Sequence, residues 1–458
     1  MFLHQFNNAF IGHSSYYFES DGVAAVVDPE WDCSPYLNLA KERKARIDYV
    51  FLTRIQDSYI SGHSELAEKT GCKLVVGTCP GIGFDAHFAK DEEVFRLGKH
   101  LIQILSKEVI AAELCCYLLY DEAEYPFALF SGDVLTIPED EGYKKSENGW
   151  ELNPFIEQQM NLVTSKIMSL PDYVLVLPNK AIRSKSFVST RIAGWNTLGK
   201  LKDEFPELMM DKQDFWSRFY LKSRPAEADI ESLVCTLNKR VLPHFEDVLN
   251  HSNHGLSPAA IKLALESGVI ILDFRDTEEF GKGFIKGAIH VGKDRNMEYW
   301  IRRLVPSGTS LLIVSEPGTE LEIISRLLLI GYTQLIGYLD GGMDAWLKVG
   351  FRVDQIDSYS WEELKLMDEN EQYIPLDVRT NKSWQEKQLL SGLHIPLEEL
   401  NYRWKELSRE QGYAIVCSDG YRSMIAASYL KSKAYTFIVN IKGGIAELSS
   451  HLLKFAHS

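Results

Sequence analysis

The chain alternates short apolar runs with longer amphipathic stretches over most of its length. In its first 240 residues the apolar runs come close together, among them GVAAVVD, IDYVFLT, CCYLLYD, FALFSGDVL and DYVLVLP. Runs of this length, bounded by polar or turn-forming residues, predict strands that are buried on both faces. Amphipathic stretches such as SGHSELAEKTG predict helices between them. This order of elements predicts a layered αββα sandwich over residues 1–245.

The last two hundred residues contain an internal repeat. The first copy reads VIILDFRDTEEF, KGAIHV, LLIVSEPGTE and GYTQLIGYLDGGMDAW, and the second reads YIPLDVRTNKSW, SGLHIPL, YAIVCSDGYRS and AYTFIVNIKGGIAEL. The equivalent positions are Asp273 and Asp377, His290 and His394, Ser315 and Cys417, and Gly341 and Gly443. Because the offsets stay nearly constant, we interpret the two stretches as copies of one fold.

Each copy has the pattern of an α/β domain with a parallel sheet. Short apolar runs such as SLLIV and QLIGYL predict buried strands, and LEIISRLLLIGY and MIAASYLKSKAY predict the helices that cover them. We therefore expect α/β domains at residues 256–350 and 356–458. The segment before the first copy mixes Pro, His, Asn, Gly and Ser, and we interpret its later part as a linker.

Length and charge narrow the classes of function. A chain of 458 residues is long enough for about three domains, at ~150 residues each. The formal net charge of −15 disfavours nucleic acid and acidic membrane surfaces as partners. The start, MFLHQFNNAFIGHSS, lacks the basic residues and long apolar core of a secretion signal. No apolar run approaches the ~18 residues of a membrane span. We expect a cytoplasmic protein.

The cysteine content agrees with a reducing compartment. The chain has seven cysteines, an odd number, and no C-x-x-C pair. A disulfide framework is therefore not expected. One cysteine, Cys417, stands in the string CSDGYRS, between the apolar run YAIV and the helical stretch SMIAASYLK.

A thiol between a buried strand and a helix start is favourably placed for nucleophilic chemistry. Unpaired backbone N–H groups and the positive end of the helix dipole favour the thiolate form of Cys417. Gly420 can adopt a positive φ and let the loop curl into a cradle of N–H donors. Arg422 adds a fixed cation for an anionic sulfur compound. An isolated cysteine would more often be a buried structural residue, but this context favours a nucleophile.

The loop resembles the active-site loop of the rhodanese family, which has the pattern C-x-x-G-x-R-[ST]. The family's other marks are present in order: Asp377 and Arg379 in LDVR, His394 in HIP, and Gly443 and Gly444 in KGG. The resemblance implies that Cys417 takes sulfane sulfur from thiosulfate or a small persulfide, and passes it to a thiol or cyanide without a cofactor. Arg422 would grip the anion. The remaining loop residues would bind substrate, namely Ser418, Asp419, Gly420, Tyr421 and Ser423.

Two features of the loop bear on alternative chemistry. Related phosphatase loops place the arginine one residue further from the cysteine, whereas Arg422 follows Cys417 after four intervening residues. The shorter loop suits one sulfur atom better than a phosphoryl group, so a phosphatase is disfavoured. Asp419 would raise the pKa of the thiol and repel thiosulfate if it pointed inward. We expect it to point outward, and we keep less charged donors such as glutathione persulfide open.

The first copy lacks these groups. Its loop has Ser315 in place of the cysteine and Glu320 in place of the arginine. A hydroxyl without a neighbouring base is a poor sulfur nucleophile. We expect this copy to be inactive and to serve as a docking surface.

Residues 1–240 resemble the metallo-β-lactamase superfamily in stretches such as AVVDPEWDCSPYL, FALFSGDVL and VLVLPNKA. With the repeat, the whole chain is similar to bacterial fusions of a persulfide dioxygenase to tandem rhodanese domains. The resemblance also implies a homo-oligomer. The family's metal ligands, however, are not present in this chain.

The positions that would bind metal hold other side chains. Where the family has H-x-H-x-D, this chain has Arg54, Gln56 and Ser58, and the later histidines are replaced by Ile110 and Lys180, so that only Asp133 remains. A mononuclear iron site of this family needs two histidines and one carboxylate. We expect no metal here. Arg54 and Lys180 would pair with Asp133 in a salt-bridge cluster or bind an anion.

Other functions stay open from the sequence. One is a persulfide dioxygenase with an unorthodox metal site, with His13, His63 or His87 as replacement ligands. The other is a non-catalytic sulfide-sensing scaffold.

Overall fold

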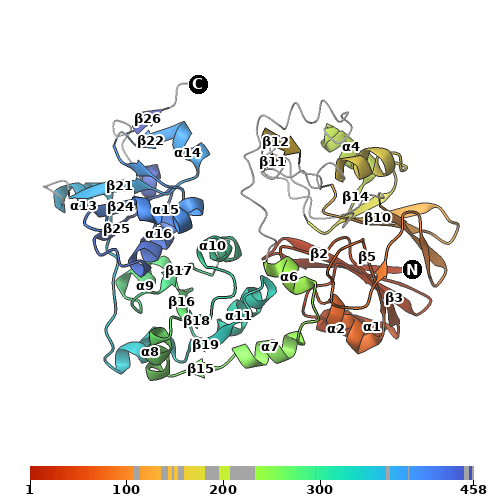
Figure 1. Ribbon diagram of the computed structural model, residues 1–458, viewed down its shortest axis with the longest axis horizontal. Coiled ribbons are helices and arrows are strands. Elements are labelled where there is room, and N and C mark those ends of the chain that lie inside the picture. Colours follow the sequence, from red (N-terminus) through yellow and green to blue (C-terminus); the bar gives the residue numbers. More distant parts are fainter. Residues whose placement is uncertain are drawn as a thin grey trace. The chain divides into compact units, whose positions relative to one another are not determined.

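The computed structural model describes residues 1–106, 114–135, 143–146, 149–152, 159–180, 195–206, 233–293, 296–367, 372–389, 391–447 and 453–455. The chain divides into two compact units (Figure 1). The first comprises Met1–Asp247 with Leu329–Gly331, and the second comprises Val248–Leu328 with Tyr332–Ser458. No helix in the described part of the chain is long and apolar enough to cross a membrane.

The N-terminal unit contains two six-stranded mixed sheets. The first has the order β1 (Phe2–Asn8), β2 (His13–Ser20), β3 (Val23–Val27), β4 (Arg46–Phe51), β5 (Lys73–Val76) and β6 (His87–Phe88). The second has the order β14 (Asn196–Thr197), β13 (Leu175–Pro178), β10 (Pro126–Gly132), β9 (Cys116–Tyr120), β8 (His100–Leu105) and β7 (Val94–Leu97). A separate hairpin joins β11 (Tyr143–Ser146) to β12 (Gly149–Leu152).

Side chains alternate between the faces of these strands, which builds three apolar layers. Along β4, Phe51 packs between the two sheets, where it meets Phe95 and Tyr117 of the second sheet. Its neighbour Val50 faces the opposite layer with Leu66. A third layer lies outside the second sheet. Because both faces of each sheet are covered, the strands are nearly continuous apolar runs.

Helices complete the outer layers. Figure 1 shows α1 (Ser34–Arg43) and α2 (His63–Thr70) on the first sheet, and α4 (Leu198–Glu204) beside the second. The π-helical turn Val163–Ile167 contributes to the same outer layer as α4. The unit also contains α6 (Leu233–Asn238). This arrangement confirms the predicted αββα sandwich.

The C-terminal unit contains two five-stranded parallel sheets with one topology. The first has the order β15 (Gly255–Leu256), β19 (Leu335–Leu339), β18 (Leu311–Val314), β16 (Ile270–Asp273) and β17 (Ile289–His290). The second has the order β20 (Ser358–Tyr359), β25 (Ile438–Ile441), β24 (Gly412–Val416), β21 (Tyr373–Asp377) and β23 (Leu393–His394). The strands of each copy follow the same order.

The register of the strands supports the same equivalence. Asp273 pairs with His290 in the first sheet, and Asp377 pairs with His394 in the second. These are the positions that the sequence repeat matched. The predicted pair of parallel α/β domains is therefore confirmed.

Several helices accompany each sheet. The first copy has α8 (Pro258–Glu266), α9 (Thr277–Lys282), α10 (Met297–Leu304), α11 (Glu320–Leu329) and α12 (Gly342–Lys348). The second has α13 (Trp361–Met367), α14 (Asn381–Glu386), α15 (Leu400–Arg403) and α16 (Tyr421–Ser432), with 3-10 turns at Leu397–Glu399, Trp404–Glu406 and Gly444–Glu447. A short sheet also joins β22 (Lys387–Leu389) to β26 (Leu453–Phe455).

The segment interpreted as a linker has more regular structure than expected. Helix α7 spans Phe245–Ser252, and β15 begins at Gly255. Glu246 and Asp247 in the first turn and His251 in the last turn complement the helix dipole. The His251 carbonyl accepts a hydrogen bond from His254 Nδ1 at 2.8 Å, so these two histidines close the end of this helix.

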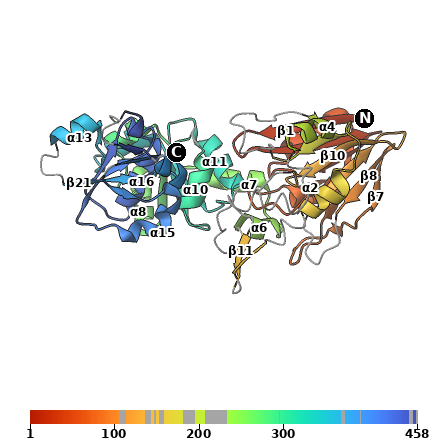
Figure 2. The same cartoon turned by 90° about the horizontal axis from the view of Figure 1, so that it is seen from above.

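The two α/β copies contact each other directly. Helix α16 of the second copy packs on β17 of the first, and the His290 amide donates a hydrogen bond to Ser428 Oγ at 2.9 Å. Lys431 Nζ forms an ion pair with Asp354 at 2.8 Å. Helix α10 also contacts α15 (Figure 2). The first copy therefore supports the helix that follows the cysteine loop.

Candidate functional site

Cys417 lies directly after β24, at the carboxyl edge of the second parallel sheet. Every residue of β24 is buried, and Cys417 itself has no exposed surface. Gly420 follows with a φ of 94° and is the residue before α16. A left-handed residue at this point turns the chain from strand to helix within a few residues. The predicted strand, loop and helix around Cys417 are therefore confirmed.

The sulfur of Cys417 is surrounded by polar groups of its own loop. The Gly420 N–H donates to Cys417 Sγ at 3.1 Å, and Ser423 Oγ lies 3.4 Å from the same sulfur. Both come from the N-terminal end of α16, where backbone N–H groups and the helix dipole carry partial positive charge. A thiolate or a persulfide anion at this position would be stabilised by these groups.

A glycine pair holds the backbone of Cys417 from the other side. The Ile445 N–H donates to the Cys417 carbonyl at 2.9 Å. Gly444 has a φ of 57°, and a Cβ atom added there would lie 2.3 Å from the Cys417 carbonyl oxygen. The chain can therefore approach the cysteine this closely only with glycine at position 444.

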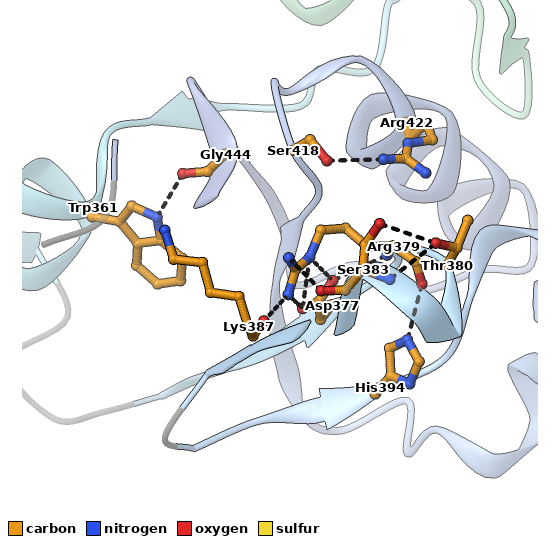
Figure 3. A network of polar contacts seen from close by, with 10 residues as sticks. All are labelled: Trp361, Asp377, Arg379, Thr380, Ser383, Lys387, His394, Ser418, Arg422 and Gly444. Carbon is orange, nitrogen blue, oxygen red and sulfur yellow. Dashed lines mark hydrogen bonds and ion pairs between the residues drawn. The ribbon is translucent and has the colours of Figure 1, made fainter. Parts of the chain in front are cut away.

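Arg422 stands at the outer side of the loop. Its Nη2 donates to Ser418 Oγ at 2.9 Å, and Figure 3 shows the guanidinium beside Ser418 above the sheet. Ser418 is exposed and Arg422 is half-buried. The predicted cation is thus in the cysteine loop, bound to a loop hydroxyl.

Tyr421 connects the loop to the first copy. Its hydroxyl donates to the carbonyl of Val291 at 2.6 Å, and its ring lies near Gly292 and His290. The sequence predicts a substrate-binding role for Tyr421 but not this contact. No pattern along the chain signals it, because it joins the two repeats in space.

Asp419 does not turn away from the cysteine as expected. The residue is exposed, but its Oδ1 lies 3.6 Å from Cys417 Sγ and accepts a hydrogen bond from the Tyr421 amide at 3.3 Å. The tight turn before α16 explains this, because a short acidic side chain there can bond an amide two residues onward. The expectation of an outward carboxylate is therefore wrong.

Asp377 and Arg379 form a buried pair beneath the loop (Figure 3). Arg379 Nη2 contacts Asp377 Oδ2 at 2.7 Å, and its Nε contacts Asp377 Oδ1 at 3.0 Å. The guanidinium also donates to the carbonyls of Ser383 and Lys387. This geometry ties β21 to α14 and β22, so the pair braces the strand that lies next to β24.

The first copy has the same brace but no nucleophilic loop. Arg275 Nη2 contacts Asp273 Oδ2 at 2.7 Å, as in the second copy. Ser315 is buried, and its hydroxyl has no hydrogen-bond partner in the described part of the chain. The Glu320 carboxylate accepts from the Gly318 amide at 2.7 Å. An acidic side chain therefore occupies the loop where the second copy has Arg422.

Three of the positions that the resemblance implied as a degenerate metal site lie together in the N-terminal unit, namely Arg54, Asp133 and Lys180. Arg54 Nη1 donates to Asp133 Oδ2 at 3.0 Å, and Lys180 Nζ lies 3.9 Å from the same oxygen. Arg54 also contacts Asp57 at 2.9 Å. Burial alone would raise the pKa of Asp133, but Arg54 and Lys180 outweigh it and hold this pKa below its usual value. The predicted salt-bridge cluster is present.

This cluster does not suit a metal ion. Arg54 and Lys180 place two positive charges beside Asp133, which disfavours the binding of a metal cation there. Gln56 is buried, and the amide of its side chain has no hydrogen-bond partner among the described residues. Ile110 lies outside the described residues. No group of three or more His, Cys, Asp and Glu side chains in the described part could hold a metal.

A buried network of hydrogen bonds around Asp28 lies near this cluster, and the sequence pattern does not predict it. Asp28 accepts hydrogen bonds from the Thr53 amide at 2.8 Å, from Thr53 Oγ1 at 2.6 Å and from Asn179 at 3.3 Å. Burial nevertheless raises the pKa of Asp28 to about 6. His13 Nε2 donates to the Asp28 carbonyl at 2.9 Å, and burial lowers the pKa of His13 to about 3. The only signal was the aspartate that ends the apolar run GVAAVVD.

Comparison with known proteins relates the C-terminal part of the chain to an established domain family. Residues 257–349 and 360–451 match the rhodanese-like domain family. A sulfurtransferase of Allochromatium vinosum is 29% identical over 99 residues, which cover 22% of this chain and 91% of the relative. The putative sulfur carrier protein YrkF of Bacillus subtilis is 30% identical over 81 residues, 18% of this chain but only 44% of that relative.

A solved structure shows where the N-terminal fold belongs. A metallo-β-lactamase from Staphylococcus aureus superimposes with a TM-score of 0.61 at 22% sequence identity, covering 74% of this chain and 98% of the other. The likeness concerns the fold. Residues 257–349 and 360–451 are thus rhodanese-like domains in tandem, and they follow an N-terminal domain of the metallo-β-lactamase fold.

Proposed function

We propose that the protein is a rhodanese-type sulfurtransferase that carries sulfane sulfur on Cys417. The observation that carries this proposal is the Gly420 N–H directed at Cys417 Sγ at the start of α16. The sulfurtransferase named among the relatives supports it. The donor would be thiosulfate or a small persulfide, and the acceptor a thiol or cyanide.

The proposed reaction has two half-steps. In the first, the Cys417 thiolate attacks the outer sulfur of the donor, and the donor's S–S bond breaks with its electron pair on the leaving group. In the second, the acceptor attacks the outer sulfur of the Cys417 persulfide and releases the thiolate. The Gly420 N–H and the hydroxyl of Ser423 stabilise the anionic sulfur in both resting forms. Arg422 receives the anionic part of donor or acceptor.

Intact-mass spectrometry of the full chain tests this proposal. Incubation with thiosulfate or glutathione persulfide should add the mass of one sulfur atom to the wild type, and cyanide should remove it. Cys417→Ala should abolish the gain. Cys235→Ala is the matched control, because Cys235 is a half-buried thiol of the N-terminal unit, and it should load like the wild type. A wild type that gains no sulfur from either donor would overturn the proposal.

A further inference from the structure

The cysteine loop carries one anionic side chain, Asp419, and one cationic side chain, Arg422, and their balance affects which sulfur donor Cys417 can accept. Asp419 is exposed, yet its Oδ1 lies 3.6 Å from the fully buried Cys417 Sγ. It therefore stands at the boundary between the thiol and solvent. Arg422, the one cation of residues 417–423, donates to Ser418 Oγ. The charged side chains of the loop thus sum to zero.

A loop whose own charged side chains sum to zero is poorly matched to a dianion. Thiosulfate carries two negative charges and would have to approach a thiolate that already has a carboxylate beside it. Coulomb repulsion is strongest at short distances, and it is screened less near a buried group than in bulk water. An organic persulfide presents a sulfur atom with at most one charge at the reacting end. The same loop therefore repels it less.

We infer that Asp419 is a specificity-determining residue that favours organic persulfides over thiosulfate. The inference rests on the proposed function and narrows its donor class. In the favoured reaction, Cys417 loses its proton and attacks the outer sulfur of R–S–SH. The S–S bond of the donor breaks, its electron pair stays on R–S, and R–S takes one proton to leave as a thiol. No oxidant or reductant is consumed.

With thiosulfate as donor, the S–S bond breaks with its electron pair on sulfite, which leaves as a dianion. The donor therefore carries two negative charges beside Asp419 throughout the step, and Arg422 supplies only one positive charge within residues 417–423. Asp419 thus opposes the approach of thiosulfate to Cys417.

Single-turnover sulfur loading, followed by intact mass at low and high ionic strength, tests the inference. In the wild type, glutathione persulfide should load Cys417 at least about tenfold faster than thiosulfate. The thiosulfate rate should rise with added salt, since salt screens repulsion between like charges. Asp419→Asn should raise the thiosulfate rate about tenfold and weaken its salt dependence. It should change the persulfide rate by a much smaller factor, so that the ratio of the two rates falls.

Glu410→Gln provides the matched control. Glu410 is exposed and precedes β24 at the end of the strand opposite Cys417. The change in net charge equals that of Asp419→Asn, but the donor preference should stay at the wild-type ratio. Asp419→Ser serves if the asparagine variant does not fold, and the salt series on the wild type needs no variant.

The outcomes separate the inference from the proposed function. If both donors load the wild type at equal rates, or if Asp419→Asn leaves the ratio of the two rates unchanged, the inference is overturned while the transferase stands. If neither donor loads Cys417, the proposed function fails and the inference fails with it. If the wild type loads persulfide faster, and Asp419→Asn raises the thiosulfate rate toward the persulfide rate, the proposed function and the inference are both supported.

Discussion

Gly444 lies directly against the backbone of Cys417. The Cβ of an alanine at this position would lie 2.3 Å from the Cys417 carbonyl oxygen. The backbone φ of 57° is also one that residues other than glycine rarely adopt. Relief of this overlap must move the loop, and with it the N–H groups that face the sulfur. A change of one methyl group is therefore expected to reach the chemistry.

Gly444→Ala should lower the rate of sulfur loading on Cys417 by at least about tenfold and reduce the melting temperature. Gly350→Ala separates overlap from backbone strain. Gly350 has a φ of 77°, but an added Cβ would meet nothing within 4 Å. The control should cost about 1 to 2 kcal/mol of unfolding free energy through its φ alone, with unchanged loading. Equal loading rates in the two variants would contradict this account.

At the residue scale, local patterns predicted which groups belong to the loop but not how each side chain is oriented. Cys417, Gly420 and Arg422 followed from a short string with a fixed backbone path. The direction of Asp419 depends on competition between solvent and the Tyr421 amide, a balance of small energies that no spacing rule reports. The Tyr421 contact with Val291 joins residues 130 positions apart, so it too lay beyond local analysis.

At the scale of the elements, the repeat made most of the C-terminal fold predictable. Equivalent strands occupy equivalent places in both sheets, and each copy has its own Asp and Arg brace. The short helix α7 escaped prediction, because its eight residues carry Asn, His and Ser, which are weak helix formers. Its stability depends on contacts rather than on local preference.

The buried braces allow a comparison between the two copies. Arg379→Ala would leave the Asp377 carboxylate buried without its partner, which typically costs about 3 to 5 kcal/mol. Arg275→Ala should cost a similar amount, since the two pairs have the same 2.7 Å contact. Below the unfolding temperature only Arg379→Ala should slow sulfur loading, because only its loop leads to the cysteine. Chemical denaturation and intact mass provide the two measurements.

A lysine in place of Arg379 separates the effect of charge from the effect of side-chain shape. Arg379→Lys keeps the positive charge but cannot form the two-pronged contact with Asp377 or reach both carbonyls. It should recover part of the lost stability. Full recovery would mean that charge, rather than the shape of the guanidinium, holds β21 and α14 together.

At the scale of the whole molecule, the N-terminal unit carries a cluster of charged and buried polar groups at positions where the family resemblance implied a degenerate metal site. The family resemblance predicted which positions would meet, and Arg54, Asp133 and Lys180 do meet. It did not predict the hydrogen bonds around Asp28, because they come from segments that are 25 and 151 residues away. These groups make the stability of this unit depend on pH.

The His13 ring provides a pH test of that stability. Its folded pKa of about 3 lies below the ordinary value of 6.5, so the unfolded chain binds more protons between these values. Stability therefore falls as pH decreases through this window. From pH 7 to pH 5 the wild type should lose about 2 kcal/mol more unfolding free energy than His13→Gln. Calorimetry of the full chain at each pH measures this difference.

The comparison with His13→Gln is needed because another group acts in the opposite sense. The pKa of Asp28 is raised to about 6, so the folded state binds more protons at this carboxyl than the unfolded chain does. The contribution of Asp28 therefore makes the folded state more stable as the pH falls toward its ordinary pKa. The difference between the two proteins isolates His13 from it. Parallel pH curves for the wild type and the variant would rule out this role of His13.

The absence of exposed surface on Cys417 has a consequence for oxidative damage. Peroxides convert accessible thiolates first to sulfenic acid and then to forms that cannot be reduced again, and access governs the rate. A sulfur enclosed by its own loop is shielded from this attack while it is idle. Cys417 of the resting protein should therefore outlast an episode of peroxide stress that consumes exposed cysteines, and keep its thiol for the proposed sulfur transfer afterwards.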